Sequence, residues 1–213
     1  MTALIILSEE IMKKNTYTAA LFLIITLYCN RQENNDAEKK HPEKGLNPQE
    51  IASQAVGKAK AELGKNLLNA ISSKGAAYAV SFCSEKALAL TEEMSKQYNV
   101  RLKRVSDRPR NQSNLANDEE LTVIKNFKTQ LEKKEKLTPA FRETETEFIG
   151  YFPIETNQMC MQCHGKKDTD IHSSVYENIL KIYPEDKAVG YSENQIRGIW
   201  TVMIQKKNNE GYR

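Results

Sequence analysis

Residues 47–71 read NPQEIASQAVGKAKAELGKNLLNAI and contain a helix start followed by one long apolar stripe. Asn47 can cap a helix, Pro48 suits its first position, and Glu50 completes a capping box. Apolar side chains then recur every fourth residue, at Ile51, Ala55, Ala59, Leu63, Leu67 and Ile71. This spacing predicts one long amphipathic helix that ends near Gly75.

A second helix is predicted over residues 76–98, with Cys83 on its inward, apolar face. That face consists of Ala79, Val80, Cys83, Ala87, Leu90 and Met94, which lie three or four residues apart as in an amphipathic helix. Residues 100–106 are β-branched near both ends and predict a strand. Residues 107–116 are rich in Pro, Asn, Ser and Arg and predict a loop.

The remaining elements mix helices and strands. Asn117 and Glu120 form another capping box, which opens a helix with an apolar side made of Leu121, Ile124, Phe127 and Leu131. Further elements are a strand over 142–154 with a break at Gly150 and Pro153, a short helix over 173–182, and a strand over 196–205, IRGIWTVMIQ. Because no strand-helix-strand rhythm is present, the expected fold class is α+β rather than a parallel doubly wound sheet.

Composition and charge describe an ordinary folded domain with extensions. Of 213 residues, 39% are hydrophobic and 28% are charged, which excludes fibrous and polytopic membrane classes. The 31 Lys and Arg residues nearly balance 28 Asp and Glu residues, so the net charge is +3. Nucleic-acid-binding domains usually have a clear basic excess, and nucleic acid is therefore not expected as a partner.

Residues 1–28 have the layout of a secretory signal peptide. Lys13 and Lys14 precede the apolar stretch 19–28, and Cys29 follows at once. A cysteine at this position resembles the lipidated cysteine of bacterial lipoproteins, although Tyr28 stands where a small residue is usual. We therefore expect export to the bacterial cell envelope with a membrane anchor on Cys29. An uncleaved anchor and a plain signal peptide are the alternatives.

Translation is expected to begin at Met12, because two glutamates shortly before it are atypical of the basic start of a signal. Residues 29–46 are highly charged and nearly devoid of apolar side chains, so they predict a flexible tether. The folded domain is then expected over 47–206, followed by a C-terminal tail over 207–213.

Residues 160–164 read Cys-Met-Gln-Cys-His, the C-x-x-C-H signature of covalent haem attachment. The two thiols lie one turn of chain apart, so each can add to one haem vinyl group, while His164 can reach the iron. Composition alone would produce this pattern about 0.001 times in such a chain. The motif also agrees with export, since bacteria attach c-type haem outside the cytoplasm. We therefore expect one haem c, covalently attached to Cys160 and Cys163.

Three alternatives for the cysteine pair stay open. A thioredoxin-like dithiol needs no following histidine and usually occurs in a parallel βαβ context. A structural zinc site could combine Cys83 with Cys160, Cys163 and His164, but the adjacent Cys163 and His164 would rarely both reach one tetrahedral ion. A plain disulfide between Cys160 and Cys163 is the third.

The sixth ligand of an iron bound to His164 has five candidates: Cys83, Met159, His172, His41 and water. Met159 and His172 lie close to the motif in sequence, so reaching the opposite haem face is awkward for them. Cys83 is distant in sequence and lies on the inward face of a helix, as a distal ligand requires. The alternative is a buried cysteine that packs as a small hydrophobe.

Four strings together resemble a known family: AVSFCSEKALALTEEMSKQYNVRLKRVSDRPRN, YFPI, CMQCHG and YPEDKAVGYSENQIRGIW. The family consists of single-haem c-type domains with a PAS-like antiparallel sheet and long N-terminal helices, and was long labelled a domain of unknown function. Its members are stand-alone exported proteins or extracytoplasmic input domains of histidine kinases. The resemblance covers residues 47–206. It implies that the iron is held by His164 and by Cys83.

The resemblance also suggests contacts to the haem. Arg104 and Arg110 match the family pattern and could pair with the haem propionates, whereas Arg101 and Arg108 are expected on a solvated strand edge. The segment Tyr151, Phe152, Pro153 and Ile154 is expected to wall the haem pocket, with ordinary core packing as the alternative. Tyr191 and Arg197 match the family without an assigned role. Here Gln112 follows Arg110-Asn111 where the family usually has Pro.

Two functions remain in view. A PAS-like pocket with haem suits a redox- or ligand-responsive sensor, in which a change at the iron alters Cys83 ligation and moves its helix. A six-coordinate iron suits the alternative, a periplasmic electron-transfer cytochrome. Catalysis is not expected, because a peroxidase needs distal acid–base residues and His41 and His172 are the only histidines outside the motif. Either function implies a separate redox or signalling protein as partner.

Overall fold

The computed structural model describes residues 46–206. The predicted signal peptide 1–28, Cys29, nearly all of the tether 29–46 and the tail 207–213 lie outside these described residues. Within them, no helix combines the length and the apolar character that crossing a bilayer requires.

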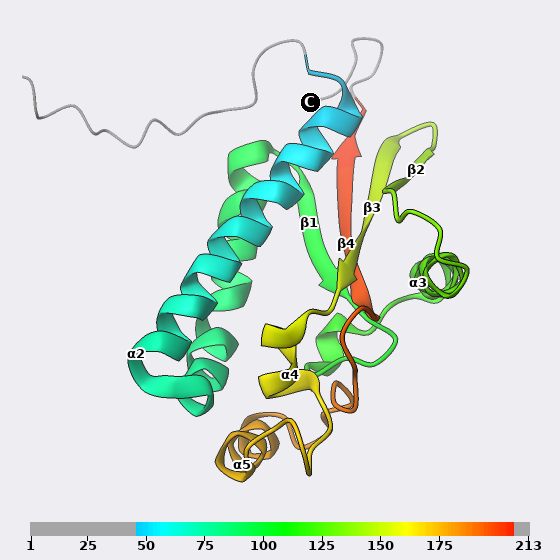
Figure 1. The fold of residues 1–213 in the computed structure, drawn as a ribbon. Helices are drawn as coiled ribbons and strands as arrows, with labels where there is room; N and C mark the ends of the chain where they lie inside the picture. Colours follow the sequence, from blue (N-terminus) through cyan, green and yellow to red (C-terminus); the bar gives the residue numbers. More distant parts are fainter. Residues whose placement is uncertain (1–45, 207–213) are drawn as a thin grey trace, which may run out of the picture. The chain divides into compact units, whose positions relative to one another are not determined.

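Helix α2 (Pro48–Tyr98) contains both predicted N-terminal helices. The Asn47 side chain accepts the Glu50 N–H and Glu50 caps Asn47 in return, so the predicted capping box is confirmed. The helical path is interrupted at Gly75 (φ 84°, ψ 171°), a left-handed conformation that glycine adopts without steric cost. The chain reverses there, and the two halves of α2 lie side by side as a helical hairpin (Figure 1).

Four antiparallel strands form one sheet in the order β1-β4-β3-β2. Their bounds are β1 (Arg101–Val105), β2 (Ala140–Glu143), β3 (Glu147–Glu155) and β4 (Ile196–Gln205). The C-terminal strand β4 is central, and it has the bounds predicted from its Ile, Trp and Val residues. The predicted α+β class with an antiparallel sheet and long N-terminal helices is confirmed.

The single strand predicted over 142–154 is wrong. The chain forms a hairpin of β2 and β3, and the Thr144 hydroxyl accepts the Glu147 N–H in the turn between them. β3 also runs unbroken through Gly150 and Pro153. Pro153 is tolerated because β2 begins at Ala140, opposite Tyr151, so β3 has only β4 beside it at the proline.

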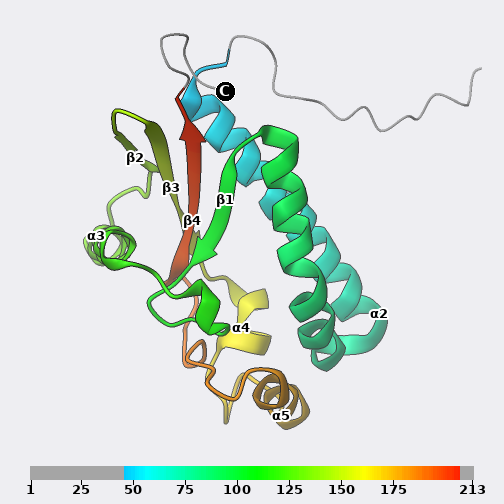
Figure 2. The ribbon, with the colours of Figure 1, turned by 180° about the vertical axis from the view of Figure 1, so that it is seen from behind.

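Helices cover both faces of the sheet (Figures 1 and 2). α2 packs on one face, where the buried core includes Ala52, Val56, Ala59, Met94, Leu102, Phe148, Phe152, Trp200, Val202 and Ile204. α3 (Asp118–Glu132) packs on the other, where the core includes Val105, Ala116, Ile124, Phe127, Ile149, Tyr151, Ile196 and Ile199. Of the predicted stripe, Ala59 belongs to this core and Ile51 and Leu63 pack against it, while Ala52 and Val56, which lie outside the stripe, complete the buried side of the first half of α2.

Three short helices lie beyond one end of the sheet: η1 (Gln112–Asn114), α4 (Gln158–His164) and α5 (Ser173–Ile182) (Figure 2). α5 packs against the second half of α2 through Val80, Val175 and Ile179. The Asn178 amide also donates to the Ala77 carbonyl at 2.6 Å. These contacts hold α5 against the second half of α2.

Candidate functional site

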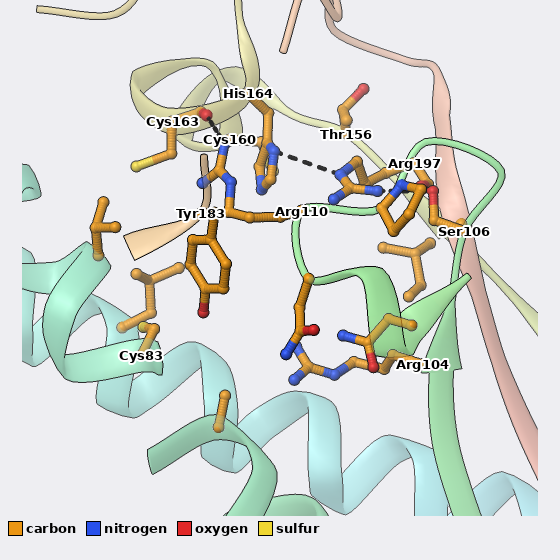
Figure 3. Close-up of a pocket in the computed structure, with 18 of the residues that line it drawn as sticks. Cys83, Arg104, Ser106, Arg110, Thr156, Cys160, Cys163, His164, Tyr183 and Arg197 are labelled. Atoms are coloured by element: carbon orange, nitrogen blue, oxygen red, sulfur yellow. Dashed lines mark hydrogen bonds between the residues drawn. The ribbon is translucent and has the colours of Figure 1, made fainter. Parts of the chain in front are cut away.

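A cavity of about 330 Å³ lies where the α2 hairpin, the end of the sheet and α4 meet. That volume is in the range of small-molecule and cofactor sites. Six of the predicted site residues line it: Cys83, Arg104, Arg110, Cys160, Cys163 and His164. They come from three stretches far apart in sequence, around residue 83, residues 104–110 and residues 160–164, and Figure 3 shows them around one open space.

Helix α4 brings the motif residues together. Asn157 caps it by accepting the Cys160 N–H at 3.3 Å, and the helix continues to His164. Residues three and four apart share one face of a helix, so Cys160 is aligned with both Cys163 and His164. All three line the cavity, and the described cysteines are free thiols.

Gly165 lets the chain turn tightly after the motif. A Cβ at this position would lie 2.5 Å from the Asp170 Cβ and 2.7 Å from the Met161 carbonyl oxygen, so larger residues do not fit. A segment further along the chain bonds to the motif backbone: the Tyr191 N–H donates to the His164 carbonyl at 2.9 Å. The backbone of the motif is therefore held on both sides.

His164 is held as a neutral imidazole. Its Nδ1 lies 2.7 Å from the Ala188 carbonyl oxygen, which can only accept, so Nδ1 carries the proton and Nε2 keeps its lone pair. Burial, followed by the charges of Arg110 and Arg197, lowers the pKa of His164 well below its ordinary value. A neutral histidine with Nδ1–H bonded to a carbonyl is the usual state of a metal-binding histidine.

Cys83 reaches the cavity from the second half of α2. Beyond the sheet, the stripe of the first half continues with Leu67 and Ile71, and these two side chains line the cavity with Cys83. Burial raises the pKa of the Cys83 thiol, and the charge of Arg104 opposes that rise. The inward orientation predicted for Cys83 places it on the same cavity as His164.

Arg110 has a partner within the protein. Its Nη2 and Nε lie 3.2 Å and 3.3 Å from the two oxygens of Asp186, and Nη2 also donates to the Cys163 carbonyl. The side chain of Asp186 is 1% exposed and that of Arg110 is 14% exposed, so this is a buried ion pair. Arg110 thus fixes the motif backbone, and Asp186 largely offsets its charge.

Arg104 is different, because it forms no ion pair with any carboxylate among the described residues. Its guanidinium lies 5.3 Å from the centre of the Trp200 ring, a cation–π contact. Burial lowers its pKa, and the nearby Cys83 acts in the opposite direction. Arg104 therefore offers an uncompensated positive charge to the cavity.

A sequence model of the family described as Tll0287-like matches residues 8–205. The chain belongs to the Tll0287-like family. The solved structure of the cyanobacterial haem protein Tll0287 superposes with a TM-score of 0.56 at 17% identity, covering 78% of this chain and 100% of that one. No protein of curated function matches the chain in sequence.

This Tll0287-like membership confirms the family resemblance predicted from the sequence. The likeness to the solved structure establishes a shared fold.

The charges of this Tll0287-like cavity fit a haem. The guanidiniums of Arg104, Arg110 and Arg197 line the cavity together with the exposed Glu155, and the buried carboxylate of Asp186 pairs with Arg110 behind the lining. The buried charges therefore have a positive excess, which is the sign that ionised propionates would balance. The described residues contain no group of three His, Cys, Asp or Glu side chains placed to hold a metal ion, as tetrahedral zinc would need.

Two site predictions need correction. Tyr151 does not line the cavity; it packs on the α3 face of the sheet, where its hydroxyl donates to Glu119 at 2.6 Å. Neighbouring strand residues point to opposite faces, so the whole segment 151–154 could not form one wall, and only Ile154 lines the cavity. Arg108 is not a free basic edge, because it donates to the Lys187 and Val189 carbonyls.

The sequence alone assigned no role to four other parts of the site. Tyr183 lines the cavity between Cys83 and Arg110 (Figure 3), and burial raises the pKa of its hydroxyl. Asp186 and the Ala188 carbonyl orient Arg110 and His164. Arg197, whose role was open, lies 3.3 Å from His164. All four belong to the string YPEDKAVGYSENQIRGIW, whose resemblance to the family was the available signal.

Proposed function

We propose that the chain is a haem c protein in which Cys160 and Cys163 attach one haem and His164 and Cys83 bind its iron. The observation that carries this proposal is that all four residues line one cavity, with the Nε2 lone pair of His164 left available. A covalently attached haem supplies one-electron redox chemistry and an iron centre that responds to small ligands.

The chain's own residues would hold that group at defined points. Arg104 offers its uncompensated guanidinium to a propionate, and Arg110 keeps the motif backbone in place through the Cys163 carbonyl. The Ala188 carbonyl fixes the tautomer and ring plane of His164. Leu67, Ile71 and Val80 provide apolar wall, which suits the flat porphyrin.

We further propose that the protein acts as a redox- or ligand-responsive sensor. Cys83 is carried by the half of α2 that follows Gly75, and this half is tied to α5 by the bonds from Asn178 to Ala77 and Ser81. Loss of Cys83 from the iron would release its constraint on this helix pair. A change at the iron would thereby alter the surface of α2 and α5 that a separate signalling protein could bind.

Electron transfer is the second candidate function, and it is favoured by the partial solvent exposure of Cys160, one of the two cysteines that would attach the haem. Cys160 is only partly buried, and its neighbours Gln158 and Gln162 on α4 are exposed. The haem edge bonded to Cys160 would therefore border solvent, where a redox protein could approach it. A carrier would keep both axial ligands when it is reduced, whereas a sensor would exchange one.

The proposal places the protein in the bacterial cell envelope, with a lipid anchor on Cys29, and assigns it no catalytic residue. Its support is the signal-like sequence before Cys29 and the motif that needs extracytoplasmic haem attachment. Cys29→Ala would be expected to move the mature protein from the membrane fraction to the soluble fraction. Retention in the membrane fraction would contradict lipidation.

Covalent attachment is tested directly by denaturing electrophoresis with a peroxidase stain for haem. Protein matured together with a haem c attachment system should stain, and the double variant Cys160→Ala, Cys163→Ala should not. A stained double variant, or an unstained wild type beside a stained control cytochrome, would refute the proposal. Spectra taken after reduction and after addition of carbon monoxide then separate the two functions. Ligand exchange supports the sensor, and unchanged ligation supports the carrier.

A further inference from the structure

Arg197, the second residue of β4, lies directly beside the proposed iron-binding histidine. Its Nε is 3.3 Å from Nδ1 of His164, and its Nη1 donates to the Ser106 hydroxyl at 2.8 Å and to the Arg108 carbonyl at 3.1 Å. Figure 3 shows the guanidinium between Ser106 and His164. The hydrogen bonds fix the charge in position, so it cannot swing away from the imidazole.

The Nε–H of Arg197 points at Nδ1 of His164 (dashed in Figure 3), but this contact of 3.3 Å competes with the shorter one of Nδ1 to the Ala188 carbonyl. Nδ1 donates its proton to the Ala188 carbonyl at 2.7 Å, so it has no lone pair left to accept from Arg197. Two donors therefore face each other, and the protein maintains this contact by anchoring Arg197 elsewhere. Packing alone would not require a guanidinium here, since an apolar side chain would fill the space without the cost of desolvating a charge.

The charge of Arg197 is poorly compensated. None of the described carboxylates forms an ion pair with it. Asp186 is paired with Arg110 and acts on Arg197 only as a weaker influence without direct contact. The face of the Tyr191 ring lies 5.4 Å from Arg197 and is shared with Arg108 at 4.5 Å. Burial lowers the pKa of Arg197, yet a guanidinium remains protonated at any ordinary pH.

We infer that Arg197 is a positioning residue that raises the reduction potential of the haem held by His164. The inference rests on the proposed function. A fixed positive charge next to the proximal ligand favours the ferrous iron, which carries one positive charge less than ferric iron. It also opposes transfer of electron density from the imidazole to the iron. Thiolate ligation by Cys83 acts in the other direction, so Arg197 would limit how far the potential falls.

The test is a potentiometric titration of the haem-loaded protein, followed by its optical spectrum. Arg197→Gln should shift the ratio of reduced to oxidised protein at least tenfold toward the oxidised form, which is a fall of 59 mV for one electron. Arg197→Lys keeps the charge and should retain most of the wild-type potential. Arg108→Gln is the matched control, because it removes a guanidinium from the same Tyr191 ring without a contact to His164.

The inference is overturned if Arg197→Gln keeps the wild-type reduction potential. It is also overturned if the potential falls equally in the Gln and Lys variants, since the charge of residue 197 would then not affect the potential. Should Arg197→Gln fail to fold, Ser106→Asp provides a second test. It places a carboxylate next to Arg197 Nη1 and should also lower the potential, whereas an unchanged value would contradict the inference. Absence of covalent haem from the wild type would instead refute the proposed function, so the two failures are distinguishable.

Discussion

The substitution Asp186→Asn hardly changes the shape of the side chain, yet it should destabilise the protein because it removes a buried charge. The carboxylate accepts from Arg110 at 3.2 Å and 3.3 Å and from the Ala188 N–H at 2.8 Å. Removing one partner of a buried ion pair costs about 3–5 kcal/mol. Arg110 keeps its bond to the Cys163 carbonyl and is 14% exposed, which reduces this cost. We expect a loss of about 2–3 kcal/mol in the free energy of unfolding.

Urea unfolding of the haem-loaded protein, followed by far-ultraviolet circular dichroism, measures this loss. The matched control is Asp168→Asn, the same change at an exposed residue between α4 and α5, which should stay within about 0.5 kcal/mol of wild type. Asp186→Asn should also perturb the haem spectrum, because the backbone of Ala188 bonds to Asp186 through its N–H and to His164 through its carbonyl. If Asp186→Asn and Asp168→Asn unfold at the same urea concentration, the reasoning from the buried ion pair is refuted.

Further predictions concern the sheet and its α3 face. Gly198→Ala would make a Cβ collide with the Val105 carbonyl oxygen, and the substitution should lower the free energy of unfolding in urea by about 2 kcal/mol. Its control, Gly57→Ala, meets no atom within 4 Å and should gain about 0.5–1 kcal/mol as a helix substitution; equal effects would contradict the steric argument. Burial, and then the hydrogen bond to Glu119, raise the pKa of the Tyr151 hydroxyl above its ordinary value of 10. This hydroxyl therefore ionises at lower pH in the unfolded chain than in the folded one, and the free energy of unfolding falls as the pH rises above 10. Tyr151→Phe should lose about 1 kcal/mol at neutral pH and show a shallower alkaline fall, whereas parallel pH profiles would exclude this coupling.

Local sequence signals predicted most of the elements, because capping and periodicity depend on neighbouring residues. The capping boxes at Asn47 and Asn117 and the strand 196–205 agree with the structure. The break at Gly75 was also predicted, since a glycine there permits the left-handed conformation. The β2–β3 hairpin was missed because its turn at Thr144 lacks glycine and proline, and is stabilised by a threonine hydroxyl.

The site was only partly predictable, for a different reason. Cys160, Cys163 and His164 are adjacent in sequence, so their spacing identified them, and the helical face of Cys83 indicated its direction. The partners of His164 are contributed by the backbone at Ala188 and by Arg197, which only the folded chain brings near. A backbone carbonyl has no residue-specific signal in a sequence. The pairing of Arg110 with Asp186 likewise depends on a loop path that local patterns do not specify.

The most direct test of the central claim is the optical spectrum of wild type and Cys83→Ala, oxidised and then reduced with dithionite. Both proteins should be matured with a haem c attachment system. We predict sharp Soret and α bands for wild type, and an altered spectrum with haem still attached for Cys83→Ala, because the variant loses one axial ligand while Cys160, Cys163 and His164 remain. A colourless wild type would contradict haem binding, and identical spectra would contradict ligation by Cys83.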